Sequence, residues 1–552
     1  MTKKQMTPWL RLIGLLELEK RDILQIFYYA IFAGVVALSL PLGIQAIINL
    51  IQGAQVSTSW IILVILVTLG VAFSGSLQLM QLRIIETIQQ RIFMRSSFEL
   101  AYRFPKIKMA ELRNYYPPEL ANRFFDTLTI QKSLSKILID VPTAVLQILF
   151  ALILLSFYHP FFIVFGFLLL ILVLAVFKFT ARKGLETSLN ESKNKYKVAH
   201  WIQEIARSVI SFKLSGNTNL STNKNDDLVS GYLKARESHF KVLMLQFIQM
   251  ISFKVIVTAS LLLIGGALVL NQEMNIGQFV AAEIIIILVI ASVEKLILGL
   301  ESFYDTLTSL EKIGQIVDKN LENQEGETPP YKNGIHIELE DVSYEVSNRD
   351  KHILKHISLE LNSKSRILVK GESGSGKSTL LRLISGVIEA TSGNIYVNDM
   401  SIKSLKLNYY RSQLGLSLSD ESPFEGSIRE NLSFGNQDIT DDNIYKVLEI
   451  VGLKNYVKEL PNGLNTILYP DGKQLSYTLS KKIVLARAIL KAPKILILED
   501  ALDRFNETET KSIIEFLTHK DRPWGLIVVS SSSAWIDRCT EIITLEKGKI
   551  KN

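Results

Sequence analysis

The segment SRILVKGESGSGKSTLLRLISGV, residues 365–387, decides the fold of the C-terminal part of the chain. It contains the pattern G-x-x-x-x-G-K-[ST] from Gly371 to Ser378, after an apolar stretch that predicts a strand and before an amphipathic stretch that predicts a helix. Glycines in such a loop let successive backbone N–H groups turn inward around phosphate oxygens, and the helix N-terminus adds partial positive charge. The segment therefore predicts a P-loop, which binds the phosphates of a nucleotide.

Lys377 and Ser378 carry the predicted chemistry of this loop. The Lys377 ammonium is expected to reach the β- and γ-phosphates, and the Ser378 hydroxyl is expected to bind Mg²⁺. A glycine-rich turn without a ligand is the alternative, but the flanking strand and helix favour a nucleotide site. The residues predicted to surround the phosphates are Gly371, Glu372, Ser373, Gly374, Ser375, Gly376, Lys377, Ser378 and Thr379.

The N-terminal part of the chain has the composition of a membrane protein. The 552 residues are 48% hydrophobic, and Pro160 divides one long apolar region into two because proline breaks a helix. We therefore expect an α-helical polytopic membrane domain with six spans in contact with membrane lipid, since a span needs ~20 apolar residues. The predicted spans are 23–51, 60–81, 141–159, 161–177, 245–270 and 277–300.

The connections between these spans predict the orientation of the chain. The short connections 52–59, 157–160 and 271–276 contain no Lys or Arg, whereas the long connections 83–140 and 178–241 are strongly basic. By the positive-inside rule, the long connections and both termini face the cytoplasm. The long connections contain few Gly or Pro, so we expect spans two to five to continue past the bilayer as helical stalks.

The composition changes near residue 320. The segment NLENQEGETPPYKNG lacks a periodic apolar pattern and contains two prolines, which is typical of a linker. From Ile335 onward strands alternate with helices, which indicates an α/β domain with a largely parallel sheet. We predict a transmembrane domain at 1–320, a linker at 321–334 and a nucleotide-binding domain at 335–552.

Bulk composition excludes some other classes of protein. The single cysteine, Cys539, excludes a disulfide framework within the chain and a zinc site built from cysteines. The net charge of +7 is small for this length, and we expect no nucleic-acid partner. The first twenty residues predict no signal peptide, because charges interrupt them and no small-residue cleavage site follows. They fit either a helix lying flat at the membrane surface or a simple lead-in to the first span.

Six spans with basic stalks, a linker and a P-loop domain resemble, in this order, an ABC exporter half-transporter of the type I exporter fold. The resemblance also covers PPELANRF at 117–124, SIRENLSFG at 427–435, LARAIL at 485–490 and IITLEKGKI at 542–550. In that family two subunits close head to tail, and each ATP lies between one P-loop and the LSGGQ signature of the opposite subunit. The resemblance implies ATP and Mg²⁺ as cofactors, a second half-transporter subunit as partner, and outward transport of a substrate.

The catalytic positions of the family are altered in this chain. In KILILEDALDRF, residues 494–505, the Walker B position that supports Mg²⁺ holds Glu499 instead of Asp, and the catalytic glutamate position holds Asp500. An aspartate carboxylate sits ~1.5 Å short of a glutamate carboxylate, which is enough to spoil the geometry of attack. The Q-loop glutamine position holds Ser419, and the switch histidine position holds Ser531.

Two further motifs of the family are altered. The signature reads LSYTL, so that Ser476 is retained while Tyr477 and Thr478 replace glycines that allow close approach to the γ-phosphate. The position of the adenine-stacking tyrosine holds Val346, with Tyr344 two residues earlier. Together the alterations predict a site that holds ATP but lacks groups that cleave it.

Three functions remain open from the sequence. The chain could dimerise as an active exporter, serve as a degenerate subunit beside a competent partner, or bind ATP as a regulatory or receptor-like membrane protein without turning it over. We favour a transporter subunit with weakened hydrolysis, because the stalks and coupling-like segments are retained. The substrate is unknown. A periplasmic adaptor is one further partner, and we expect no N-terminal peptidase or docking domain before the first span.

Charges inside the last two spans predict a functional role, because unpaired ions are costly in a membrane. By a rise of ~1.5 Å per residue, Lys254 and Glu294 both sit ~24–26 Å from the outer surface. They could pair in one conformation and separate in another, or each could extend to the headgroups. Glu283 lies only ~9 Å deep by the same rise and is expected to line a pathway or a dimer seam.

Overall fold

The computed structural model of the chain describes residues 6–52, 58–332, 334–346 and 352–551. The chain forms two compact units. The first comprises Met1–Pro105 and Asn114–Lys319, and the second comprises Lys106–Arg113 and Asn320–Asn552. The chain thus leaves the first unit at Lys319, beside the boundary predicted at residue 320. The segment 106–113 falls inside the predicted transmembrane domain at 1–320 but belongs to the second unit.

The segment 106–113 belongs to the second unit because it pairs with the chain that follows residue 319. The Lys108 backbone N–H donates to the Asn320 carbonyl at 3.0 Å, and Ile107 forms an antiparallel bridge with Leu321. The Lys108 ammonium also lies 2.8 Å from the Glu389 carboxylate. No periodicity in the sequence signals these contacts, since they join segments that are more than 200 residues apart.

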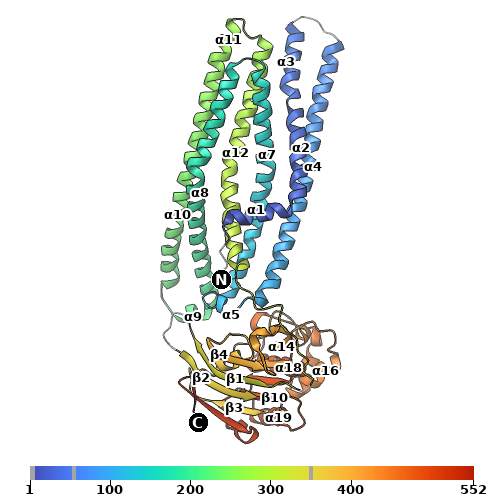
Figure 1. Cartoon of the computed structure of the whole chain (residues 1–552), viewed down its shortest axis with the longest axis vertical. Coiled ribbons are helices and arrows are strands. Elements are labelled where there is room, and N and C mark those ends of the chain that lie inside the picture. The colour runs from blue at the N-terminus through green and yellow to red at the C-terminus, as the bar shows by residue number, and fades with distance from the viewer. Residues whose placement is uncertain (1–5, 53–57, 333, 347–351, 552) are drawn as a thin grey trace. The chain divides into compact units, whose positions relative to one another are not determined.

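The first unit consists of long helices that lie side by side (Figure 1). A short helix, α1, precedes them, and its Trp9 ring lies 5.0 Å from the Phe303 ring. Two short helices, α6 (Pro117–Ala121) and α9 (Val209–Leu214), lie at the turns of the two stalk hairpins. Helix α1 spans Pro8–Leu18, and another short helix, α11, spans Gly266–Leu270. The longer helices are α2 (Lys20–Ala37), α3 (Ser39–Gln52), α4 (Thr58–Arg103), α7 (Asp126–Ser156), α8 (Phe161–Arg207), α10 (Leu220–Ser260) and α12 (Ile276–Val317).

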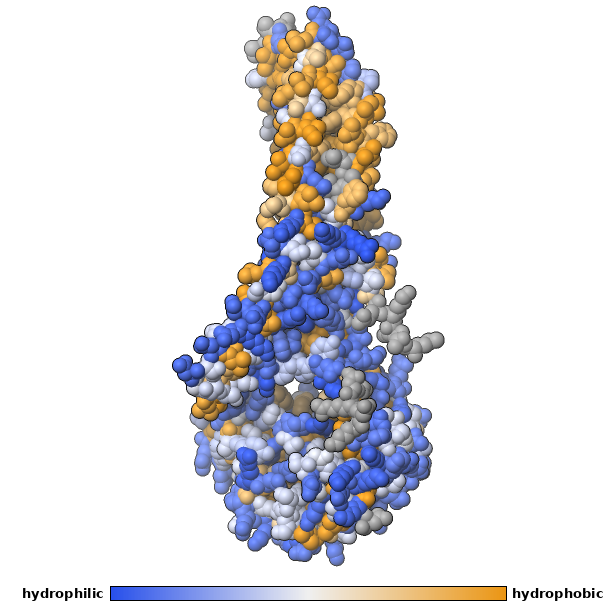
Figure 2. Space-filling model, turned by 90° about the vertical axis from the view of Figure 1, so that its left-hand side faces the viewer, coloured by the Kyte–Doolittle hydropathy of each residue, from blue (hydrophilic) through white to orange (hydrophobic). Residues whose placement is uncertain are grey.

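Five stretches of helix among the described residues are long and apolar enough to cross a membrane, one fewer than the six predicted spans, and they confirm the predicted α-helical polytopic membrane domain. Figure 2 shows apolar side chains covering the half of the helical unit near α11, and hydrophilic side chains covering the stalks. The apolar start of α8, Phe161–Ile171, is shorter than the others among the described residues. The candidate spans are Lys20–Gln52, Thr58–Lys106, Pro117–Ser156, Leu220–Leu270 and Ile276–Val317.

The helices continue well past the thickness of a bilayer, as the sequence predicted for the stalks. Helix α8 has 47 residues, which at ~1.5 Å per residue gives about 70 Å against a hydrocarbon core of ~30 Å. Between α7 and α8 the chain turns at 157–160, as the position of Pro160 predicted. Helix α12 begins with a capping box, in which Asn275 and Gln278 satisfy each other's backbone N–H groups at 2.7 and 2.9 Å. Residues 53–57 of the first short connection lie outside the described residues.

The second unit contains two main sheets. One is antiparallel, in the order β2 (His352–Leu361), β1 (Ile337–Glu345), β4 (Ser392–Val397) and β5 (Met400–Ser401). The other is parallel over five strands, with β12 added antiparallel at one edge. Its order is β12 (Lys549–Lys551), β11 (Glu541–Glu546), β3 (Arg366–Lys370), β10 (Gly525–Val529), β9 (Ile495–Glu499) and β6 (Leu414–Ser417). This is the predicted α/β domain, in which the carboxyl ends of β3, β9 and β10 meet at one edge.

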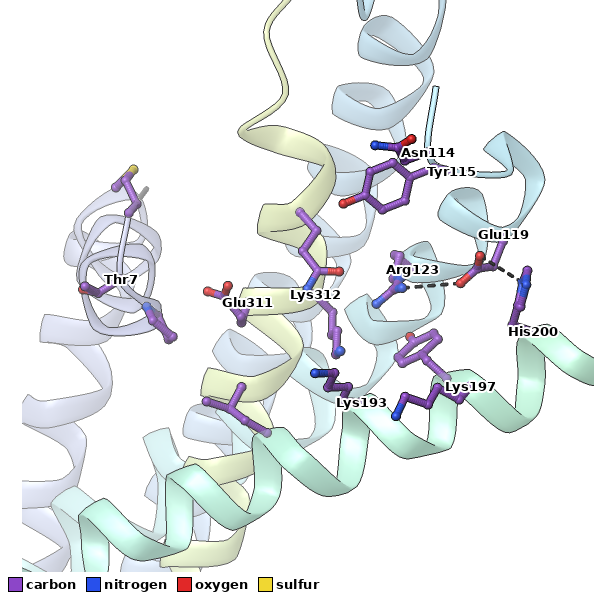
Figure 3. Close-up of a pocket in the computed structure, with 15 residues that line it drawn as sticks. Thr7, Asn114, Tyr115, Glu119, Arg123, Lys193, Lys197, His200, Glu311 and Lys312 are labelled. Atoms are coloured by element: carbon purple, nitrogen blue, oxygen red, sulfur yellow. Dashed lines mark ion pairs between the residues drawn. The ribbon is translucent and has the colours of Figure 1, made fainter. Parts of the chain in front are cut away.

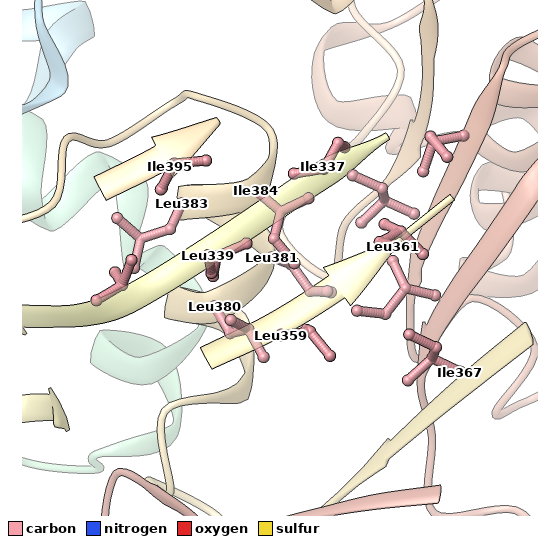
Figure 4. Close-up of a cluster of buried hydrophobic side chains, with 14 of the residues drawn as sticks. Ile337, Leu339, Leu359, Leu361, Ile367, Leu380, Leu381, Leu383, Ile384 and Ile395 are labelled. Carbon is pink, nitrogen blue, oxygen red and sulfur yellow. The ribbon is translucent and has the colours of Figure 1, made fainter. Parts of the chain in front are cut away.

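Helix α13 (Lys377–Ile384) fixes the P-loop because its apolar residues are buried between strands of both sheets. Figure 4 shows Leu380, Leu381 and Ile384 of this helix gathered with Ile337 and Ile367 from the strands. The five side chains are fully buried. Burying a side chain of this size contributes about 1.5–3 kcal/mol, so the N-terminus of α13 is held firmly at the end of β3.

Candidate nucleotide-binding site

The P-loop connects the end of β3 at Lys370 to the start of α13 at Lys377. Gly374 and Gly376 adopt left-handed backbone angles, with φ of 81° and 106°, which other residues rarely adopt. A Cβ on Gly376 would lie 2.6 Å from the Leu354 side chain. Gly376, which the motif requires, is therefore needed here both for backbone conformation and for close packing, whereas Gly374 is needed for backbone conformation alone.

The loop lines a cavity of about 860 Å³ and presents groups that fit phosphate oxygens. The Lys377 ammonium donates to the carbonyls of Gly371 and Glu372, both at 2.8 Å. The Ser375 hydroxyl is buried and has no hydrogen-bond partner among the described residues. Buried polar groups are normally paired, so this hydroxyl and the loop around it are consistent with a ligand that supplies acceptors. All nine predicted P-loop positions from Gly371 to Thr379, apart from Gly371 itself, line this cavity.

Glu499 and Ser378 bring two oxygen ligands together beside the P-loop. The Glu499 side chain is 3% exposed at the end of β9, and its carboxylate accepts a hydrogen bond from the Ser378 hydroxyl. It also accepts one from the Ser419 backbone N–H at 3.2 Å. Mg²⁺ prefers oxygen ligands and is commonly held by one or two protein groups together with phosphates. The two side chains therefore fit the predicted metal-binding role.

Asp500 lines the cavity next to Glu499. Its backbone adopts a left-handed φ of 47°, and its N–H donates to the Val529 carbonyl at 2.9 Å. Burial, together with the neighbouring Asp503, raises the pKa of the Asp500 carboxyl to about 6. A carboxylate with a pKa near 6 can accept a proton at neutral pH, although its reach is that of aspartate.

The Q-loop position Ser419 also lines the cavity, and an unpredicted residue holds its backbone in place. The Lys481 ammonium, from α18 (Tyr477–Leu490), donates to the carbonyls of Leu418, Ser419 and Glu421 at 3.1, 2.7 and 3.1 Å. Lys481 is 4% exposed, and burial lowers the pKa of its ammonium. Only its place five residues after Ser476 in the chain could have drawn attention to it.

Ser531, at the switch histidine position, is exposed and is not among the residues that line the cavity. The preceding residue, Ser530, does form a side-chain hydrogen bond: its hydroxyl donates to the Asp503 carboxylate at 3.0 Å. Asp503 in turn interacts with Asp500. The described residues thus connect Asp500 to Asp503 and Ser530, while the Ser531 side chain remains outside this network.

The signature residues form the start of α18. Ser476 caps this helix, and its hydroxyl accepts a hydrogen bond from the Leu479 N–H at 3.2 Å. The Tyr477 ring lies 4.4 Å from the Arg504 guanidinium, which indicates a cation–π contact. The Thr478 hydroxyl donates to the Arg504 carbonyl at 3.4 Å. None of these residues lines the cavity around the P-loop of the same chain.

The two candidates for contact with the base have different positions. Val346 lines the cavity and packs against the hydrophobic core. Tyr344 does not line it. The Tyr344 side chain is 9% exposed, and its hydroxyl accepts a hydrogen bond from the Arg113 guanidinium. The Tyr344 side chain thus contacts the 106–113 segment and not the cavity, which its position two residues before Val346 did not indicate.

Three basic side chains line the cavity without having been predicted: His352, Lys355 and Lys547. His352 and Lys355 come from β2, and His352 lies 2.7 Å from the Glu345 carboxylate. Positive charge at the rim of a phosphate site favours an anionic ligand. No motif marks these residues, since His352 and Lys355 reach the cavity from β2 and Lys547 reaches it from the turn between β11 and β12.

Comparisons with known proteins agree with this arrangement. The family model described as the ABC transporter transmembrane region matches residues 23–293, and the model described as ABC transporter matches residues 354–503. The structure resembles that of a bacterial Atm1-family ABC exporter with ATP bound, with a TM-score of 0.84 over 97% of this chain and 94% of that chain. The two sequences are 16% identical, so this likeness concerns the fold.

Two curated relatives illustrate the range of similar sequences. A putative export ATP-binding/permease protein of Rickettsia bellii is 27% identical over 66% of this chain and 62% of its own length. The alpha-hemolysin translocation ATP-binding protein HlyB of Escherichia coli is 29% identical over 60% of this chain and 46% of its own length. The chain thus spans less than two thirds of the relatives that it matches. With a transmembrane region and a P-loop domain that match the two family models in this order, the chain belongs to the ABC transporter family.

Proposed function

We propose that the chain is an ATP-binding subunit of an ABC-type exporter, which moves a substrate outward across the cell membrane with slow intrinsic ATP hydrolysis. The observation that carries this proposal is the contrast between the phosphate-binding groups of the P-loop and the residue at the switch position. The P-loop has the full set of phosphate-binding groups, whereas Ser531 at the switch position is exposed and outside the cavity lining. ATP supplies the phosphates, and Mg²⁺ would be held by Ser378 and Glu499.

Slow hydrolysis is supported by the positions of the remaining groups. The Asp500 side chain is shorter than the glutamate that the family has at this position. The Ser419 hydroxyl cannot span the distance that a glutamine side chain spans. A positioned proton acceptor normally contributes about 10²–10⁴-fold to a reaction rate. With Ser531 in place of the family's histidine, no imidazole at the switch position assists Asp500. The same groups that hold ATP are therefore expected to release it largely uncleaved.

The proposal includes a second half-transporter subunit, either an identical chain or a different one. In this family the signature of one subunit completes the ATP site of the other, so Ser476 would act on the partner's nucleotide. Both termini and the nucleotide-binding domain would face the cytoplasm, in keeping with the basic stalks. A periplasmic adaptor would serve as a further partner if the substrate is a protein or peptide. HlyB, a relative named for alpha-hemolysin translocation, makes such a substrate worth testing.

The deciding experiment measures ATP binding and ATP turnover on the same purified chain in lipid nanodiscs. We expect stoichiometric binding of a labelled ATP analogue in the presence of Mg²⁺ and little or no phosphate release. Vigorous turnover by the chain alone would overturn the proposal and indicate an ordinary exporter. Adding an ABC subunit encoded beside it tests the heterodimer, because turnover that appears only in the mixture indicates a competent partner. Absence of turnover in every mixture would favour the regulatory function.

A further inference from the structure

A second cavity lies within the helical unit, away from the P-loop, and its lining is basic. It has a volume of about 820 Å³ and lies between the N-terminal end of α1, the α6 turn and the stalk parts of α8 and α12. Its charged lining consists of four cations (Arg123, Lys193, Lys197 and Lys312), two carboxylates (Glu119 and Glu311) and His200. The volume falls within the range of ~300–1,000 Å³ that small-molecule sites occupy.

The two carboxylates of this cavity already have cationic partners. Glu119 lies 3.5 Å from Arg123 and 3.2 Å from the His200 ring. Glu311 lies 3.8 Å from Arg11, which also pairs with Asp318. Among the described residues, no carboxylate forms an ion pair with the three lysines that line the cavity. The lining therefore has two more cations than carboxylates, and Asp126, which is not part of the lining, interacts electrostatically with Arg123 and Lys312.

Two of these cations are buried, and of the two only Arg123 has a carboxylate partner, Glu119, although an unpaired buried charge is costly. Lys312 is 6% exposed and Arg123 is 7% exposed. The Nε and Nη1 atoms of Arg123 are buried and have no hydrogen-bond partner among the described residues. Lys312 forms neither a hydrogen bond nor an ion pair within the described part of the chain. Its ammonium lies only 5.1 Å from the centre of the Tyr196 ring.

Tyr196 gathers these cations at one place. The Arg123 guanidinium lies 4.0 Å from the centre of its ring, and the Tyr196 hydroxyl donates to the Asp126 carboxylate. Figure 3 shows Lys312 from α12 and Lys193 from α8 projecting into the same space, with Arg123 facing them from the turn before α7. Lysine and arginine side chains that converge in this way are typical of phosphate recognition.

We propose that this cavity binds a phosphate-bearing anion, with Lys193, Lys197 and Lys312 as its ligands and Arg123 as a fixed charge in its wall. The excess of two positive charges in the lining matches the two negative charges of a phosphate monoester or of one end of a diphosphate. The phosphate belongs either to a soluble compound or to a lipid headgroup, since Thr7 and Pro8 at the start of α1 also line the cavity. This site is separate from the nucleotide site and does not depend on the proposed slow hydrolysis.

The experiment uses the full chain in phosphatidylcholine nanodiscs and inorganic pyrophosphate as the probe. All samples carry Lys377→Ala, which is expected to prevent pyrophosphate from binding to the P-loop. We expect calorimetry to detect one pyrophosphate site per chain. The double variant Lys193→Gln/Lys197→Gln, which changes exposed side chains, should bind it about tenfold more weakly, because a charge-assisted bond is lost. The matched control is Lys183→Gln/Lys213→Gln, which alters two exposed lysines of the same unit outside the cavity.

The source of the phosphate is identified by adding phosphatidic acid to the nanodiscs. Loss of pyrophosphate binding in these nanodiscs would show that a lipid headgroup occupies the site, and unchanged binding would show a site for soluble phosphates. Equal binding by the two double variants would overturn the proposal. Absence of pyrophosphate binding, together with equal effects of phosphatidic acid on the melting temperatures of the two double variants, would also overturn it.

Discussion

Lys254 of α10 and Glu294 of α12 form an ion pair within the membrane-spanning part of the helical unit. From the sequence, these two residues could either pair in one conformation or extend separately to the headgroups, and the structure contains the pair. Both side chains are about one-third exposed, at 37% and 34%, so the pair lies at the edge of the helix contact. Glu283 lies eleven residues earlier on α12, is half-buried, and forms no ion pair among the described residues. The pair therefore joins two spans, whereas Glu283 has no such role here.

Reversing one charge of this pair should destabilise the helical unit. Lys254→Glu or Glu294→Lys places like charges together in a region where ions are poorly solvated. The double reversal should recover about 1–3 kcal/mol of the loss, which is the range for residues in direct contact. Thermal unfolding in nanodiscs measures this recovery, and transport assays can follow once a substrate is known. If the double variant is no more stable than either single variant, the pair makes no contribution.

Replacing Lys377 by alanine should abolish ATP binding while leaving the fold unchanged. Among the described residues, the hydrogen bonds of the ammonium go to two carbonyls of its own loop, both at 2.8 Å, so little packing is lost. Lys364→Ala, an exposed lysine on the same unit outside the cavity, is the matched control. Binding of a fluorescent ATP analogue measures the effect, and wild-type affinity in Lys377→Ala would show that the loop was assigned wrongly.

Restoring the family's catalytic groups should raise ATP turnover only when several are restored together. The combined variant carries Glu499→Asp, Asp500→Glu, Ser531→His, Tyr477→Gly and Thr478→Gly. Groups that act as a unit are strongly non-additive, so each single change is expected to do little. The combination should approach the ~10²–10⁴-fold contribution of a positioned proton acceptor. Phosphate release at saturating Mg-ATP measures it. A large gain from one change alone would show that a single group limits the rate.

Asp500→Asn should change how the stability of the second unit depends on pH. The folded pKa of about 6 lies above the ordinary value of 3.8, so the folded state binds more protons than the unfolded state between about pH 4 and 6. This carboxyl therefore lowers stability as pH rises through that window. Asparagine removes the titration. The variant should melt higher than the wild-type chain at pH 7, and the difference should shrink toward pH 4. A constant difference would mean that Asp500 does not titrate as described.

Lys481→Met should loosen the Q-loop backbone. Methionine preserves most of the buried volume but leaves the Leu418, Ser419 and Glu421 carbonyls without their shared donor. Leaving buried acceptors unsatisfied costs about 1–3 kcal/mol. Amide hydrogen exchange across 418–421 should quicken, and the melting temperature should fall. Lys446→Met, an exposed lysine on α16 (Asp441–Ile450), is the control. Unchanged exchange in Lys481→Met would mean that other contacts hold the loop.

Local sequence pattern predicted the parts of this molecule that depend on neighbouring residues. The P-loop glycines and the turn at Pro160 are examples, because backbone conformation there depends on residues nearby in the chain. Contacts between distant segments were not predictable in the same way. The Arg113 guanidinium reaches the Tyr344 hydroxyl, and the Lys481 ammonium reaches the carbonyls at 418–421. A single sequence contains no periodicity or motif that records such pairings.

The placement of 106–113 in the second unit has a consequence for how the protein can be divided. The chain passes between the two units at Pro105, at Arg113 and at Lys319, so three covalent connections join them. The segment is held in the second unit by its bridge from Ile107 to Leu321 and by the Arg113 bond to Tyr344. A single protease cut in the linker therefore leaves 106–113 on the other fragment, and the non-covalent contacts of Lys108 with Glu389 and of Arg113 with Tyr344 would still hold the nucleotide-binding domain. Expressed from residue 320 alone, that domain would lack 106–113 and with it the Arg113 guanidinium that donates to the Tyr344 hydroxyl.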